Sequence, residues 1–142
     1  MNGWVDQSFP NLRSSGFRIT SVATREYNCI AWSVHDTENW WWPNPLAAYW
    51  PESAPLEETL PAFIEAFRTR GFVPCESSEV EPGYEKIAIY VDNQGVPTHA
   101  ARQLPNGSWT SKLGTFEDIE HTLDGLTGPE YGRAAQFLRR PL

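Results

Sequence analysis

Cys29 and His99 are a pair of residues in this chain that could carry out covalent chemistry. The chain has 142 residues, with two cysteines and three histidines. A thiolate is a strong nucleophile, and an imidazole within hydrogen-bond reach can take the thiol proton and later return it to a leaving group. The pair therefore predicts a cysteine hydrolase that cleaves an amide or isopeptide bond in a peptide or protein substrate.

The residue before Cys29 gives the thiol its predicted setting. Asn28 suits the N-cap position of a helix, which places Cys29 in the first helical turn. The free N–H groups and the dipole of a helix start lower the pKa of a thiol, and the same N–H groups can donate to an oxyanion. The competing interpretation is a buried structural cysteine, because free cysteine is among the most buried residue types. Cys75 lies away from any helix start, and we expect it to be inert.

A third group would hold the imidazole of His99 in the required tautomer. Asp118 is the first choice, because a carboxylate orients an imidazole best. Ser111 lies on the next strand and His121 lies shortly after Asp118 in the sequence, so both remain alternatives. The predicted catalytic set is Cys29, His99 and Asp118, with the third position open between these three residues.

Short elements with turn signals between them would position these groups. The run 86–91 predicts a central strand, and Asn106-Gly107 predicts a hairpin between strands at 98–104 and 108–113. Counting across that turn carries His99 to about Gly114. Elsewhere we expect a short strand at 17–22, an amphipathic helix from Pro61 to Gly71, a short helix from Thr115 to about His121, and a closing strand or helix at 132–138.

The loop between Asp36 and Pro55 is rich in tryptophan, especially over residues 40–50. The favoured interpretation is that the loop folds back and its indole rings cover one side of the core. The alternative is a recognition surface, which would make the chain a non-enzymatic binding module that uses this Trp-rich loop.

Composition narrows the classes of protein to consider. The formal net charge of -7 argues against nucleic-acid partners, which require clustered basic side chains. The sequence has no run of about 20 apolar residues and no signal-peptide pattern at its start, which predicts a cytoplasmic protein without a membrane partner and with reduced thiols. The length predicts a single domain over 1–142. Metal-ligand spacings and glycine-rich phosphate loops do not occur, so we expect no metal and no cofactor.

The order of these features resembles the papain-like superfamily, especially its compact NlpC-type branch. That resemblance rests on a cysteine at a helix start, then a sheet opening with His99, then a polar residue, and Tyr27 matches a tyrosine typical of the branch. It implies an α+β fold in which a nucleophile-bearing helix packs against a central antiparallel sheet. At a closer level, the stretches 27–32, 98–102, 111–114 and 118–121 are similar to an uncharacterised family of small bacterial proteins, which implies no activity.

Overall fold

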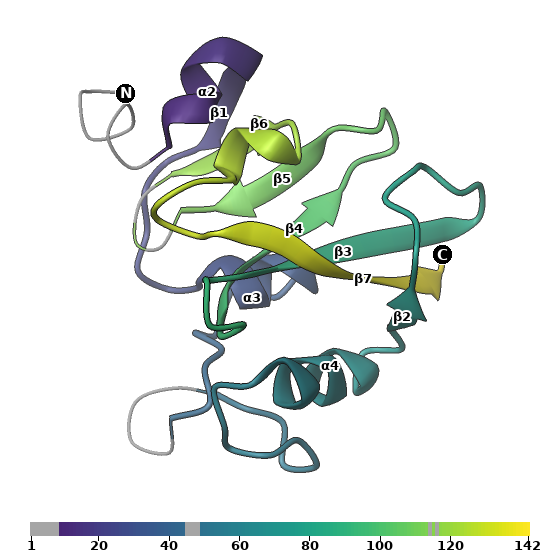
Figure 1. Ribbon diagram of the computed structural model, residues 1–142. Coiled ribbons are helices and arrows are strands. Elements are labelled where there is room, and N and C mark those ends of the chain that lie inside the picture. The colour runs from purple at the N-terminus through teal and green to yellow at the C-terminus, as the bar shows by residue number, and fades with distance from the viewer. Residues whose placement is uncertain (1–8, 45–48, 114, 116) are drawn as a thin grey trace.

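One antiparallel sheet of seven strands dominates the fold (Figure 1). The structure is a computed structural model that describes residues 9–44, 49–113, 115 and 117–142. The strand order across the sheet is β1-β6-β5-β4-β3-β7-β2. The strands are β1 (Phe17–Ser21), β2 (Val73–Cys75), β3 (Tyr84–Val91), β4 (Pro97–Gln103), β5 (Trp109–Lys112), β6 (Asp118–His121) and β7 (Arg133–Pro141).

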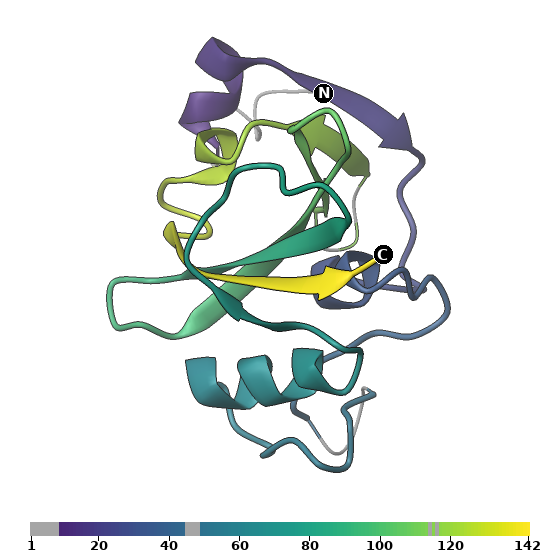
Figure 2. The ribbon, with the colours of Figure 1, turned by 90° about the vertical axis from the view of Figure 1, so that its right-hand side faces the viewer.

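The helices of the described residues are short and lie around the sheet. They are α2 (Pro10–Ser15), α3 (Cys29–Ser33), α4 (Leu60–Arg68) and the 3-10 turn η1 (Asp124–Leu126). Figure 2 shows α4 at the opposite end of the molecule from α2. The predicted amphipathic helix is confirmed as α4, where the Thr59 hydroxyl accepts a 3.3 Å hydrogen bond from the Ala62 N–H and caps the first turn. None of these helices is long and apolar enough to cross a lipid bilayer.

The predicted α+β fold, with a nucleophile-bearing helix packed on a central sheet, is wrong. The chain has a β-rich fold, and the described residues contain no such helical layer on the sheet. Cys29 begins α3, but α3 is only five residues long. Within the segment expected to form a helix from Thr115 to about His121, residues 118–121 instead form strand β6, which pairs with β5 on one side and β1 on the other, and residue 116 lies outside the described residues. Two further strands thereby join the predicted hairpin.

Pairing with a neighbouring strand on each edge explains why β6 is a strand. Ile119 is fully buried and pairs with Ile19 of β1 and Ser111 of β5, so hydrogen bonds to both neighbours replace those of a helix. The other expected strands are confirmed at β1, β3 and the β4–β5 hairpin. The undecided C-terminal segment is strand β7, which pairs with β3 from Arg133 to Pro141.

Buried hydrophobic side chains form two clusters on the two faces of the sheet. Ile87 and Ile89 of β3 belong to the first cluster, whereas Ala88 and Tyr90 belong to the second, as the alternation of a strand requires. The first cluster also contains Cys29, Ile30, Trp41, Phe63, Phe67 and Ala100. The second also contains Phe9, Leu12, Ala101, Trp109, Ile119 and Leu126.

Tryptophan rings of the 40–50 loop pack into the first cluster, as the favoured interpretation predicts. Trp41 is fully buried, and its indole N–H donates to Asp36 Oδ2 at 2.8 Å. The rings of Trp42 and Trp50 lie 5.3 and 5.1 Å from the ring of Phe63. These contacts pack the two rings against Phe63 of α4.

Candidate active site

A chain of hydrogen bonds joins three buried side chains across strands β4, β5 and β6. Nε2 of His99 lies 2.9 Å from Oγ of Ser111, and that oxygen lies 2.7 Å from Nε2 of His121. Nδ1 of His121 lies 2.6 Å from the carbonyl oxygen of Thr122. We call the three side chains the His99–Ser111–His121 relay. They share a sheet face, because each is a diagonal neighbour of the next.

With both imidazoles neutral, the chemistry of these atoms fixes the direction of every hydrogen bond in the relay. The Thr122 carbonyl can only accept, so Nδ1 of His121 carries a proton and its Nε2 accepts from the Ser111 hydroxyl. Ser111 Oγ then accepts from the Nε2–H of His99. Nδ1 of His99 is left as a lone pair, and it is buried without a hydrogen-bond partner. Buried polar atoms are nearly always satisfied, so this nitrogen requires an explanation.

Burial keeps both imidazoles neutral. It lowers the pKa of His99 well below the usual value of 6.5, and the nearby His121 lowers it further. Burial also lowers the pKa of His121 to about 4, partly opposed by its hydrogen bond to Thr122. Tyr131 stacks on the ring of His99, with centroids 3.9 Å apart and planes 11° apart. At neutral pH His99 is therefore a positioned, uncharged base.

Cys29 has the predicted cap but not the predicted acidity. Asn28 Oδ1 accepts from the Ala31 N–H at 3.2 Å, which confirms the N-cap. The side chain of Cys29 is 7% exposed, and this burial raises its pKa to about 11. Hydrogen bonding from backbone N–H groups, including that of Ala100, opposes the rise only in part. Desolvation of the thiolate outweighs whatever a five-residue helix provides, so the thiol is neutral at rest.

The thiol lies beside the strand that carries His99. Ala100, whose N–H interacts with the Cys29 sulfur, is the next residue after His99. Cys29 packs with Ala100 in the first cluster, whereas the ring of His99 stacks on Tyr131 on the face of the second cluster. The pairing of β4 with β5 begins at Arg102, so the part of β4 between the thiol and the imidazole lies beyond that pairing. No hydrogen bond joins Cys29 to His99 among the described residues.

Asp118, the first choice for orienting His99, lies elsewhere in the structure. Its Oδ2 accepts from the Tyr27 hydroxyl at 2.8 Å and from the hydroxyl of Ser21, and it makes no hydrogen bond to His99. Successive residues of a strand point to opposite faces, so Asp118 and His121 face opposite sides of β6. The group bonded to His99 is instead Ser111, one of the two alternatives, and His121 is the next link.

Neither a metal nor a disulfide is indicated among the residues that the structure describes. No group of three or more His, Cys, Asp or Glu side chains there could hold a metal ion. Cys29 and Cys75 are both free thiols.

Comparison with known proteins identifies a family whose function is unknown. A family described as a domain of unknown function (DUF7689) matches residues 18–139. No curated protein and no solved structure matches the chain. The predicted membership of an uncharacterised family is confirmed at that level.

Proposed function

The chain belongs to this family of unknown function, and we propose from its own residues that it is a cysteine-dependent hydrolase of amide or isopeptide bonds. Cys29 is the nucleophile and His99 is the general base. The observation that carries the proposal is the buried lone pair on Nδ1 of His99. A histidine held by hydrogen bonds in one tautomer, with its other nitrogen unpartnered, is arranged to accept a proton.

Attack on the substrate begins from a neutral thiol. As Sγ of Cys29 bonds to the carbonyl carbon, its proton moves to Nδ1 of His99, and the carbonyl oxygen takes up the negative charge. Backbone N–H groups near the sulfur are donors for that oxyanion. The C–N bond then breaks, and the proton on His99 passes to the leaving amine. A thioester between the acyl group and Cys29 remains.

Hydrolysis of the thioester uses the same base. Nδ1 of His99 takes a proton from water as the water oxygen attacks the thioester carbonyl. The C–S bond breaks, and the proton returns to the sulfur of Cys29. The relay supports both half-reactions, because Ser111 holds Nε2 of His99 as the donor and leaves Nδ1 free each time.

The high pKa of Cys29 gives the proposal a distinctive kinetic signature. An unassisted thiol with a pKa of about 11 reacts through its thiolate, whose fraction rises about tenfold per pH unit below that value. A thiol that transfers its proton to His99 during attack instead reacts at a rate that levels off once His99 is neutral. The low pKa of His99 places that plateau across the neutral range.

The test is acylation of Cys29 by p-nitrophenyl acetate from pH 6 to pH 9 in a Cys75→Ser background. That background leaves Cys29 as the sole cysteine of the chain. We expect a flat rate profile, a single acetyl group on Cys29 by peptide mass mapping, and slow continued release of nitrophenolate as the thioester hydrolyses. A log-linear rise over the whole range would show that Cys29 is an unassisted, structural thiol.

Two variants separate the roles of thiol and base. Cys29→Ala should abolish acylation. His99→Gln keeps an amide N–H that can donate to Ser111 but removes the basic nitrogen, so its profile should change from flat to sloped. A flat profile that persists in His99→Gln would assign the base to another residue. The proposal also requires a reducing compartment such as the cytoplasm, because oxidised Cys29 could not attack a carbonyl.

A further inference from the structure

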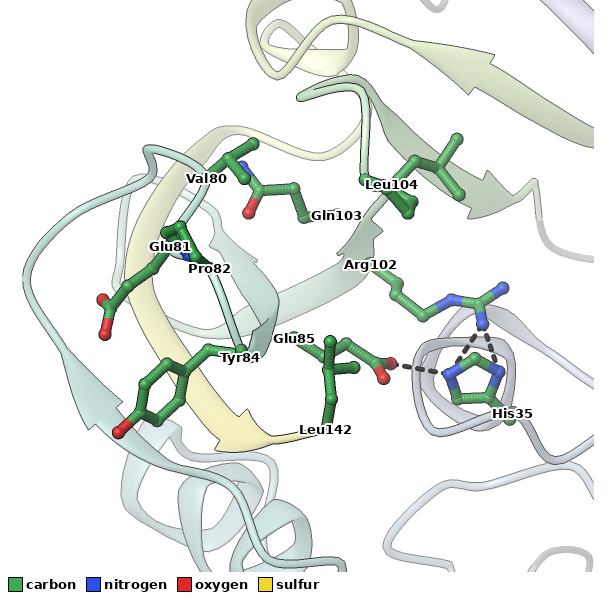
Figure 3. A pocket seen from close by; sticks show the side chains of 12 residues that line it. His35, Val80, Glu81, Pro82, Tyr84, Glu85, Arg102, Gln103, Leu104 and Leu142 are labelled. Atoms are coloured by element: carbon green, nitrogen blue, oxygen red, sulfur yellow. Dashed lines mark hydrogen bonds and ion pairs between the residues drawn. The ribbon is translucent and has the colours of Figure 1, made fainter.

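A cavity lies away from the relay, where the start of β3 meets the end of β4. Its volume is about 420 Å³, within the range of small-molecule sites. Figure 3 shows its side chains, with Arg102, Glu85 and His35 meeting at one end. The apolar part of the wall is formed by Val80, Pro82, Tyr84, Leu104, Pro105 and Leu142.

Arg102 is the unusual residue of this cavity. It is 9% exposed, yet no Asp or Glu side chain of the described residues forms an ion pair with it. Its Nη1 donates to Nδ1 of His35, because Nε2 of that ring donates to the Glu85 carboxylate. The guanidinium carbon of Arg102 lies 4.9 Å from the centre of the Trp32 ring. Its Nε is buried and has no hydrogen-bond partner. Buried guanidinium groups are normally paired with an anion.

The carboxylate of Glu85 does not fill this role, because other groups occupy both of its oxygens. Oε1 lies 2.6 Å from Nε2 of His35, and Oε2 lies 3.6 Å from Nη2 of Arg140. Glu85 therefore moderates the local charge without bonding to Arg102. The apolar wall and the unpaired cation together favour a ligand that has a negatively charged group and an apolar body.

We propose that this cavity binds a small carboxylate with an apolar body, its carboxylate bonded to Arg102 and its body against the apolar wall. A guanidinium and a carboxylate match each other in charge and in planar, two-point geometry. Glu81 and Glu85 also line the cavity, so a singly charged carboxylate is favoured over a dianionic phosphate. This site is independent of the thiol chemistry proposed above.

Three probes with the same alkyl chain test the proposal: decanoate, decanol and decyltrimethylammonium, titrated calorimetrically into the whole chain at low salt. Decanoate should bind one to one, with an affinity about tenfold or more higher than that of decanol. A hydrogen bond between charged groups contributes a gain in affinity of this size. The cation should bind weakest. Amide NMR shifts on adding decanoate should centre on Val80 and Leu104. Absent decanoate binding, equal binding of the three probes, or shifts centred elsewhere would overturn the proposal.

Variants test whether decanoate binds in this cavity. Arg102→Gln should remove the preference for decanoate over decanol. Because Arg102 is buried, a second test uses Val80, which is 47% exposed, so that its substitution should change stability little. The affinity for decanoate should be about 3- to 10-fold higher in Val80→Lys than in Val80→Glu, with little difference for decanol.

The same pair of substitutions at Val22 is the matched control. Val22 is 81% exposed and does not line the cavity, so its Lys and Glu variants should bind decanoate alike. Equal effects at Val22 and Val80 would show that the affinity for decanoate depends only on the net charge of the protein, and would overturn the assignment to this cavity.

Discussion

His99 and Ser111 are hydrogen-bonded across β4 and β5 although they are not directly paired in the sheet. Nε2 of His99 lies 2.9 Å from Oγ of Ser111. Arg102 pairs with Thr110, and continuing that register places Ala101 opposite Ser111. His99 is then a diagonal neighbour of Ser111 on the same face, at a distance that long side chains span. This relationship makes Ser111 the central link of the relay.

Ser111→Ala should damage both stability and reactivity. It leaves the Nε2–H of His99 and the Nε2 of His121 buried without partners, which costs about 1–3 kcal/mol of the free energy of unfolding for each such group. It also releases the tautomer of His99, so the acylation of Cys29 should slow by about 100-fold at pH 7. Urea unfolding and p-nitrophenyl acetate kinetics measure the two effects.

Ser33→Ala is the control for Ser111→Ala. Ser33 is equally buried, but its hydroxyl donates to the carbonyl oxygen of Cys29 within α3, at 2.9 Å, and takes no part in the relay. Its loss should lower stability modestly and leave the flat pH profile of acylation intact. If both serine variants slow acylation equally, the effect of Ser111 comes from general loosening of the fold.

Asp118→Asn decides between Asp118 and Ser111 as the group that orients His99. Asp118 bonds to Tyr27 and Ser21, so we expect Asp118→Asn to lower the free energy of unfolding while the acylation plateau persists. Tyr27→Phe removes one hydrogen bond to a buried carboxylate, worth about 1.5–3 kcal/mol, and should have the same pattern of effects. Loss of the plateau in Asp118→Asn would return Asp118 to the catalytic set.

The sequence predicted the strands around His99 well but ranked Ser111, the residue bonded to it, behind Asp118. Taking the hairpin turn as Asn106-Gly107 carried His99 to about Gly114, whereas the observed pairing of Arg102 with Thr110 carries it one residue less far. A slip of one residue moves a side chain to the other face of a strand. The predicted register therefore separated His99 from Ser111, and the correct register joins them.

The acidity of Cys29 and the structure of β6 depend on packing that local sequence does not reveal. The Asn28 cap was predictable because it is a local hydrogen bond. The pKa of Cys29 depends on the solvent excluded by the surrounding cluster, which distant segments supply. Similarly, β6 forms because β5, the preceding strand, and β1, from near the start of the chain, offer it hydrogen bonds on its two edges. The helix-capping pattern before it was overridden by those partners.

Stability should fall as the pH drops below about 6.5, because of the two buried imidazoles. In the folded protein the pKa of His121 is about 4 and that of His99 is well below 6.5, whereas both are near 6.5 in the unfolded chain. Their contribution is therefore fully present above pH 6.5. It is lost as the pH falls toward 4, because the unfolded chain binds protons that the folded protein excludes. The expected loss is about 1.4 kcal/mol per pH unit for each imidazole.

A difference measurement separates the effect of His121 on stability from the effect of titrating carboxylates. The free energy of unfolding of the parent minus that of His121→Asn should decrease steadily from pH 6.5 to pH 4.5, since only the parent carries the His121 titration. Contributions from acidic residues cancel in the difference. A difference that stays flat or rises on acidification would mean that His121 is protonated in the folded protein, which would reverse the direction of its hydrogen bond to Ser111.

Gly132 and Gly95 share a backbone conformation but differ in their surroundings, which makes them a matched pair. Their φ angles are 80° and 79°, in the left-handed region that favours glycine. A Cβ on Gly132 would lie 1.9 Å from the carbonyl oxygen of Val91, whereas a Cβ on Gly95 would meet nothing within 4 Å. Gly95→Ala should therefore cost about 1–2 kcal/mol for its backbone conformation alone. Gly132→Ala should cost about 1–3 kcal/mol more, because a backbone atom cannot rotate away.

The second effect of Gly132→Ala concerns the site. Gly132 follows Tyr131, whose ring covers His99 at 3.9 Å, so displacing this backbone should lift the ring and admit solvent to the imidazole. We expect the pKa of His99 to rise toward 6.5 and the acylation plateau to begin at a higher pH than in Gly95→Ala. Urea unfolding and the pH profile of acylation, measured on both variants, test this. Equal stabilities and equal profiles would show that β3 yields enough to accommodate the methyl group.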